Sequence, residues 1–318
     1  MSYGQDVTLG LSFQNSFDGT ANISSLYFLE VVDESLSLSI EQLTRQGMKG
    51  LFDENVNQEG KNSVDAEITI EGMAVPLGVL LSAIFDRSST AISSNYYSHT
   101  FTPKQADFDK FCAMNPITGF VDLADGGSAH TYPNLAASKI DFTIANGEFL
   151  TAKLGVLGGA YAQTNSVNVD SASFITGDAI DWSLSSLSFG GTGQCFISDM
   201  TIAVDESLEA KHMLCTTKAP SRIKRSGKRT ISINGTIQFD DQTEYQKFKS
   251  QSTQQFIATF RMSSEMLKFD LPQMKYTEFP LDVGGPGQME IAFNAKAEYH
   301  TGSGNAMTVT LINTMAGY

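Results

Sequence analysis

The chain has 318 residues, of which 41% are hydrophobic and 18% are charged, and its formal net charge is −14. This composition is that of a folded protein rather than a disordered one, and the length suggests about two domains on a prior of roughly 150 residues each. The acidic balance argues against tight binding of nucleic acid, which needs clustered Lys and Arg.

The cysteines and the apolar runs exclude further classes. Cys112, Cys195 and Cys215 are odd in number and form no Cys-x-x-Cys, so we expect reduced thiols in a cytoplasmic product rather than a disulfide scaffold. The N-terminus has neither a basic n-region nor an apolar h-region, so we expect no signal peptide. No run approaches 18 uninterrupted apolar residues, so we expect no membrane span.

The pentapeptide Val-Asp-Glu-Ser-Leu occurs twice, at Val32–Leu36 and, 172 positions later, at Val204–Leu208. A polar loop and then a strand-like segment follow each copy, starting at Lys61 and at Lys228. We interpret the chain as one domain written twice, which favours a protein that builds rings or arrays.

Strand patterns dominate the first half. Val64, Ala66, Ile68 and Ile70 alternate with polar residues, which predicts a strand with one buried face. A short apolar helix is predicted directly afterwards, over Pro76–Phe85, because Pro is tolerated in the first turn.

The region Asp86–Thr131 lacks regular patterns, and we expect an irregular insertion there with a short helix over Lys104–Phe111. After it, Ile140, Phe142 and Ile144 alternate as in a strand. The following Asn146-Gly147 predicts a type I′ hairpin turn, with Phe149–Val156 as the returning strand.

The segment Tyr161–Gly177, rich in Ser, Asn and Asp, is expected to join the halves, with the boundary near residue 170. We therefore expect domains over residues 1–170 and 171–318.

The second half repeats the order of the first. A half-buried strand is predicted from residues of one face, namely Ile231, Ile233, Ile237 and Phe239. A helix follows over Asp241–Ser250, where Asp241 and Glu244 form a capping-box pattern. The last strand pair is expected over Met289–Tyr299 and Met307–Leu311, with His300–Asn305 as the turn.

Catalytic and metal-binding patterns are missing. His99, His130, His212 and His300 are scattered and lack ligand spacing. The Gly-rich stretches lack the Lys-Ser/Thr of a phosphate loop, and no nucleophile elbow occurs. Paired carboxylates remain as an alternative, but we predict no enzyme, no cofactor and no metal.

Two loops at equivalent places differ in charge. The loop before the second repeated strand contains a basic run, Arg222, Lys224, Arg225, Lys228 and Arg229. Its counterpart, Gly47–Lys61, contains acidic and apolar residues, Asp53, Glu54, Glu59, Met48, Leu51 and Phe52. We hypothesise that these loops meet each other or neighbouring subunits when copies stack, the alternative being solvated hairpin tips.

The order of these segments resembles the major tail tube proteins of long-tailed bacteriophages. The resemblance lies in the "VDESL" strand, the polar loop Gln46–Asn62, the strand "VDAEITIEG", the helix "PLGVLLSAIF" and the closing stretch Glu290–Asn313. It covers both halves, and the irregular region Asp86–Thr131 is a departure from a plain single-domain tube protein.

The resemblance implies a mainly β fold: two tandem tail-tube-type β-sandwich or barrel domains, each with a short flanking helix. Three chains would complete a pseudo-hexameric ring, and rings would stack into the hollow tail of a siphovirus-like virion. The resemblance implies assembly with itself and with tape measure, distal tail and tail terminator proteins. DNA would pass through the lumen without specific binding, and synthesis would occur in the host cytoplasm.

Two other functions remain open at this stage. A distal tail or baseplate hub protein reuses the same fold but forms a single ring. A carbohydrate-binding β-sandwich adhesin would present aromatic residues beside acidic loops, for which Tyr96, Tyr97 and Tyr132 are the candidates.

Overall fold

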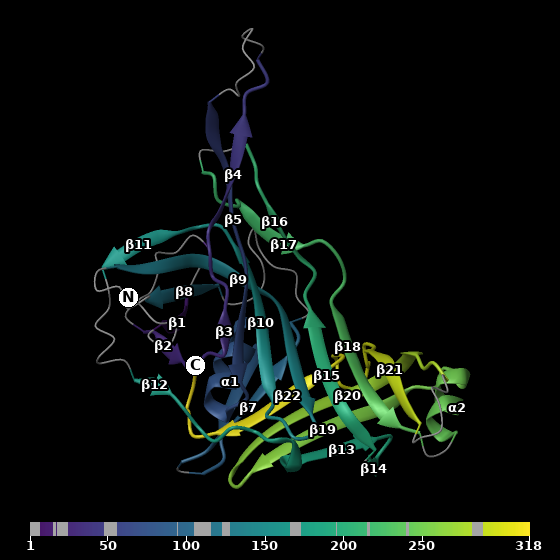
Figure 1. The fold of residues 1–318 in the computed structure, drawn as a ribbon. Helices are drawn as coiled ribbons and strands as arrows, with labels where there is room; N and C mark the ends of the chain where they lie inside the picture. Colours follow the sequence, from purple (N-terminus) through teal and green to yellow (C-terminus); the bar gives the residue numbers. More distant parts are fainter. Residues whose placement is uncertain are drawn as a thin grey trace.

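A computed structural model shows two large β-sheet layers with one helix between them, a smaller third sheet beside them and a hairpin that projects from one end (Figure 1). It describes residues 7–14, 17, 25–47, 56–93, 95–104, 116–122, 128–165, 173–194, 196–214, 217–239, 242–281 and 289–318. The predicted helix Lys104–Phe111 and the predicted boundary near residue 170 fall largely outside these residues.

The first half contains eleven strands and one helix within the described residues. They are β1 (Thr8–Phe13), β2 (Tyr27–Leu29), β3 (Asp33–Glu34), β4 (Ser39–Thr44), β5 (Asn57–Glu71), α1 (Ala74–Ile84), β6 (Asp86–Ala91), β7 (Tyr97–Thr102), β8 (Ile117–Asp122), β9 (Ser128–Ala145), β10 (Thr151–Gly158) and β11 (Ala162–Asn165). The predicted alternating strands and the apolar helix are confirmed as β5, β9, β10 and α1.

The second half begins with the short β12 (Phe174–Ile175) and a 3₁₀ turn, η3 (Trp182–Leu184). The remaining elements are β13 (Ser185–Phe189), β14 (Thr192–Gln194), β15 (Ile197–Asp205), β16 (Leu208–Lys211), β17 (Arg222–Arg225), β18 (Thr230–Gln238), α2 (Thr243–Ser250), β19 (Gln254–Met262), β20 (Glu265–Glu278), β21 (Glu290–Ala297) and β22 (Thr308–Asn313). The mainly β fold with one short helix in each half is therefore confirmed.

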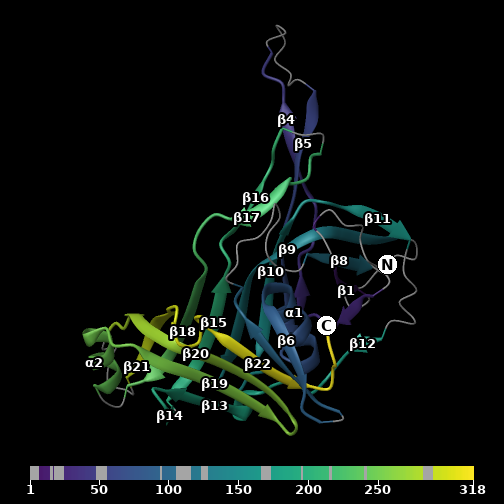
Figure 2. The same cartoon turned by 180° about the vertical axis from the view of Figure 1, so that it is seen from behind.

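One layer, here called the long sheet, consists of β5, β10, β9, β15, β18 and β21 in that order. The second sheet runs β13, β19, β20, β22, β7 and β6, and β20 also pairs with β21, so the sheet folds over rather than closing. Figure 2 shows the strands of the second sheet crossing those of the long sheet. The result is an open sandwich.

Three strand pairings join the halves within the described chain, and one of them pairs the short β12 with β2. In the long sheet, Phe142 of β9 lies opposite Ile202 of β15. In the second sheet, Leu311 of β22 lies opposite His99 of β7. One hydrophobic cluster contains buried residues from both halves. The two halves thus share their sheets and their core, and the division into two domains stays a prediction.

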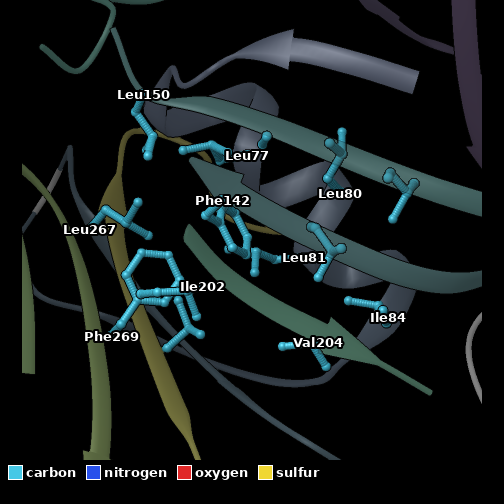
Figure 3. Close-up of a cluster of buried hydrophobic side chains, with 14 of the residues drawn as sticks. Leu77, Leu80, Leu81, Ile84, Phe142, Leu150, Ile202, Val204, Leu267 and Phe269 are labelled. Atoms are coloured by element: carbon cyan, nitrogen blue, oxygen red, sulfur yellow. The ribbon is translucent and has the colours of Figure 1, made fainter. Parts of the chain in front are cut away.

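Helix α1 lies inside the sandwich, because it contacts β9 of the long sheet and β7, β20 and β22 of the second sheet. Ten of its eleven residues are buried, as expected for a helix that is apolar on all sides. Figure 3 shows Leu77, Leu80, Leu81 and Ile84 of α1 among side chains of both sheets, including Phe142, Leu150, Ile202, Val204, Leu267 and Phe269.

Helix α2 lies at the edge of the second sheet and is anchored by a polar contact. Its Glu244 is buried and accepts hydrogen bonds from the Tyr276 hydroxyl (2.7 Å) and from the Lys247 ammonium (2.6 Å). The N-cap of α2 is Gln242, which makes no side-chain cap bond, and Asp241 of the predicted capping box lies outside the described residues. Glu244 connects α2 to the second sheet, because the buried Tyr276 hydroxyl donates to it.

The region 86–131 is more regular than expected, because its described parts form β6, β7 and β8. The sequence did not predict β6, because all its residues are exposed and therefore show no alternation of apolar and polar residues. Its only neighbouring strand in the described chain is β7. Strand β7 buries only His99 and Phe101.

Two turns differ from their sequence-based predictions. The hairpin at Asn146-Gly147 is confirmed, but only Gly147 has a positive φ (85°), so the turn is not type I′. The turn His300–Asn305 is also present, yet β22 does not return along β21. Both sides of β21 are already paired, with β18 and with β20, so β22 continues into the second sheet.

We expect Leu81→Ala to lower the free energy of unfolding by about 2–5 kcal/mol, because a fully buried side chain between two sheets leaves a cavity. Ser88→Ala on the exposed β6 should stay within about 0.5 kcal/mol of the parent protein. Urea unfolding followed by circular dichroism measures both. Equal stability of the two variants would contradict the central position of α1.

Candidate functional site

The long sheet has one apolar and one polar face. Along each strand the buried residues alternate with Asp, Glu, Lys, Thr, Ser and Asn. Seven acidic and three basic residues lie on the described polar face: Asp65, Glu67, Glu71, Asp141, Asp199, Asp205, Glu290, Lys139, Lys153 and Lys296. This face is a broad acidic surface.

The charges at the centre of this face are arranged by a glycine. Gly155 of β10 lies between Glu67 of β5 and Lys139 of β9 in the strand register. A Cβ at Gly155 would lie 2.6 Å from the Lys139 side chain, so only glycine lets Lys139 reach Glu67 across β10. Lys153 binds the second carboxylate oxygen of Glu67 at 2.5 Å. Glu67 therefore forms ion pairs with two of the three lysines. The face stays acidic because its seven acidic residues outnumber its three lysines.

The titration of these groups follows from their contacts. Hydrogen bonds from Lys139 and Lys153 lower the pKa of Glu67, and the Glu67 contact raises the pKa of Lys139. Burial is the main cause that raises the pKa of Asp141, against the opposing effect of Lys139 and Lys153.

Strands β4 and β5 form a hairpin that projects from the body, here called the arm (Figure 1). All of β4 is exposed, and Asn57–Ser63 of β5 pairs with β4. At about 3.3 Å per residue, this paired part of β5 is roughly 20 Å long. Ile40, Leu43 and Val56 are large exposed hydrophobic residues on the arm. Exposed apolar residues on a projecting element indicate a contact with another molecule.

The second hairpin, β16–β17, lies beside the base of the arm (Figures 1 and 2). The Asn62 amide donates to the Lys218 carbonyl at 3.0 Å, and His212 Nε2 lies 3.0 Å from the Asn62 carbonyl oxygen. Glu59 forms an ion pair with Lys218, which helps to lower the pKa of Glu59. Glu59 of the acidic loop therefore contacts Lys218, which precedes the basic run and which the sequence analysis did not single out. The predicted meeting of the two charged loops stays a prediction.

The basic run divides into two groups. Arg225 and Arg229 both bind Glu206, which is fully buried, with the Arg229 Nε–Glu206 Oε1 distance at 2.6 Å. Arg229 also donates to the Lys104 carbonyl at 2.8 Å. Two of the predicted contact residues thus hold the chain itself together. Arg222 and Lys228 are exposed and Lys224 is half-buried, so these three cations face outwards.

Glu206 belongs to the second copy of the repeated pentapeptide, and Glu34 is its equivalent in the first copy. Glu34 is half-buried and, among the described residues, accepts one hydrogen bond, from the Leu36 amide at 2.8 Å. The same five residues therefore have different tasks in the two halves. Of the other predicted contact residues, Met48, Leu51, Phe52, Asp53 and Glu54 lie outside the described residues.

The described contacts of His99 and the burial of the three tyrosines considered for a carbohydrate site do not indicate a binding site. His99 is buried and bonded to Ser89 and to the Met315 carbonyl, and burial lowers its pKa. Tyr132 is buried, and Tyr96 and Tyr97 are half-buried.

The described residues contain no group of three or more His, Cys, Asp or Glu suited to a metal ion. No helix in the described part is long and apolar enough to cross a membrane.

A family model described as phage tail tube protein matches residues 4–297. The chain belongs to the phage tail tube protein family. Membership implies a structural component of the virion tail, without an enzymatic role, that assembles with itself and with other tail proteins. No curated protein matches this tail tube protein.

We expect Glu206→Gln to destabilise the tail tube protein by about 3–5 kcal/mol, because it leaves two arginines at a buried site without their counter-charge. Glu34→Gln is the matched control from the first pentapeptide copy. It keeps an acceptor oxygen for the Leu36 amide and should cost less than about 1 kcal/mol. Thermal and urea unfolding of both variants measure the difference, and equal effects would contradict the assigned role of Glu206.

Proposed function

We propose that three copies of this chain form a pseudo-hexameric ring, and that rings stack into the tube through which DNA leaves the virion. The observation that carries this proposal is the long sheet, to which each half contributes three strands, joined by the β9–β15 pairing. Repeating this sheet three times around an axis gives a β-lined channel with six similar sectors.

The edges of the long sheet support ring closure. At one end, β3 pairs with only Thr69 and Ile68 of β5, and its outer side has no neighbour in the described chain. At the other end, β20 pairs with β21 only from Asn294 to Ala297, so Glu290–Phe293 are unpaired on that side among the described residues. Open strand edges are a liability that contact with a neighbouring copy removes.

The polar face of the long sheet is the proposed lining of the channel. Its seven described acidic residues outnumber its three lysines, and two of these lysines, Lys139 and Lys153, form ion pairs with Glu67. An acidic lining repels DNA phosphates, so DNA slides through without binding. In this arrangement the apolar face, with α1, lies behind the lining.

The arm and the outward cations Arg222, Lys224 and Lys228 are proposed to contact a neighbouring ring. They lie at the same end of the molecule, beyond the last β5–β10 pair at Val64 and Gly158. Contacts on only one end of a subunit, matched by a different surface on the other end, produce head-to-tail stacking.

We expect the purified protein to form striated hollow tubes, visible by negative-stain electron microscopy. Arg222→Glu should raise the protein concentration needed for tubes about tenfold, which corresponds to about 1.4 kcal/mol per contact, because it reverses a charge at the stacking surface. Lys249→Glu, the same change of charge on the exposed end of α2, should assemble like the parent.

Three outcomes would contradict this function. Monodisperse monomers would contradict self-assembly, and binding of these monomers to glycans would favour an adhesin. Single rings that never elongate would favour a hub protein. If Arg222→Glu forms tubes at the same protein concentration as the parent, the cations do not take part in the stacking contact.

A further inference from the structure

The end of the molecule opposite the arm contains a hollow of about 190 Å³. It is lined by the ends of β9 and β15 and by η3 and β13, with Ile144, Trp182, Leu187, Ile197 and Met200 as its large apolar residues. Trp182 is the only tryptophan of the chain, and 46% of it is exposed. A large aromatic residue that is half open to solvent beside a hollow is typical of a contact site.

Backbone hydrogen bonds hold this hollow in shape. The Asn146 amide donates to the Ser198 carbonyl at 2.9 Å, and the Trp182 amide donates to the Glu148 carbonyl at 3.1 Å. The Asp181 carboxylate accepts from the Ser183 amide at 2.7 Å and fixes the start of η3. The site is therefore preformed, and a ligand would pay little ordering entropy on binding.

The hollow and the arm lie at the two ends of one strand. Asn57 starts β5 in the arm, and Glu71 ends it opposite Thr151, next to the β9–β10 turn that borders the hollow. A strand of 15 residues spans roughly 45–50 Å. Figures 1 and 2 agree in placing the arm and the β9–β10 turn at opposite ends.

The two ends have opposite charge. The described residues of the arm and of the 206–229 segment contain nine basic residues and four acidic ones. The basic residues are Arg45, Lys61, Lys211, Lys218, Arg222, Lys224, Arg225, Lys228 and Arg229, and the acidic ones are Glu41, Glu59, Glu206 and Glu209. Around the hollow, the segments 145–150, 176–187 and 197–199, with Glu71, contain no Lys or Arg but five acidic residues, Glu71, Glu148, Asp178, Asp181 and Asp199.

The two ends of the molecule also differ in their apolar residues, and these differences are complementary. The arm presents Ile40, Leu43 and Val56, whereas the other end presents the Trp182 ring beside a hollow of which six of the ten lining residues are apolar. A cavity of about 150 Å³ holds a group of the size of benzene, so this hollow has room for an aliphatic side chain.

We propose that the Trp182 hollow is the receptor for the arm of a second copy of this chain, stacked head to tail. The arm's Leu43 and Ile40 fill the hollow against Trp182, and its basic surroundings face the acidic rim. This inference rests on the proposed stacking of rings, and it assigns the surface that accepts the arm.

The single tryptophan provides a direct test. When rings of the parent protein elongate into tubes, Trp182 becomes buried, so its emission should shift to shorter wavelength and acrylamide quenching should fall at least twofold. Leu43→Asp should form rings of unchanged mass by light scattering, with no emission shift and at least tenfold fewer tubes.

The control is Leu281→Asp, the same substitution at another exposed leucine, two residues after Phe279, which packs on α2. It should elongate with the parent's emission shift. Three results would overturn the inference: tubes of the parent with unshifted emission, a shift that is complete at the ring stage, or normal elongation of Leu43→Asp. Each of them leaves tube formation itself intact, whereas a parent protein that forms no tubes contradicts the proposed function.

Discussion

The pairing of β9 with β15 is the contact on which the rest of the architecture depends. It runs from Lys139–Asp205 to Ala145–Asp199 and connects strands from the two halves without a break. Because side chains alternate along each strand, this one register places Phe142 and Ile202 in the core and Asp141 on the polar face. A shift by one residue would bury Asp141 and expose Phe142, so the register is strongly determined.

The same pairing also fixes which features lie at each of the two unlike ends of the molecule. Strand β5 is bound to β9 through β10, so the arm is held at one end of the sheet and the Trp182 hollow at the other. The net charge of −14 does not reveal this difference between the ends. Nine of the 19 described Lys and Arg residues lie in the arm and the 206–229 segment, whereas the segments 145–150, 176–187 and 197–199 around the hollow contain none. A subunit with unlike ends can add copies in one direction, which is the physical requirement for a filament.

The sequence was most informative where a single periodicity governs a segment. The alternation in β5, β9 and β18 and the apolar run of α1 predicted those elements, because burial on one face or on all sides leaves a direct pattern. Strand β6 left no such pattern, since its six residues are all exposed. The path of β22 could not be predicted either, because it depends on which edges of β21 are occupied.

The roles of the candidate contact residues also could not be predicted from the sequence alone. A basic run is visible in the sequence, but its division into Arg225 and Arg229, which bind Glu206, and Arg222, which faces outwards, depends on tertiary distances. The hollow at Trp182 is lined by residues of three segments, 144–146, 182–187 and 197–200, and their meeting depends on strand pairing that no local pattern predicts.

A cryo-electron microscopy reconstruction of the assembled tubes tests the central claim most directly. The account predicts three chains per ring, with the face that contains Asp65, Asp141 and Asp205 lining the channel. A ring of six chains, or a channel lined by any other surface while this face points outwards, would contradict it.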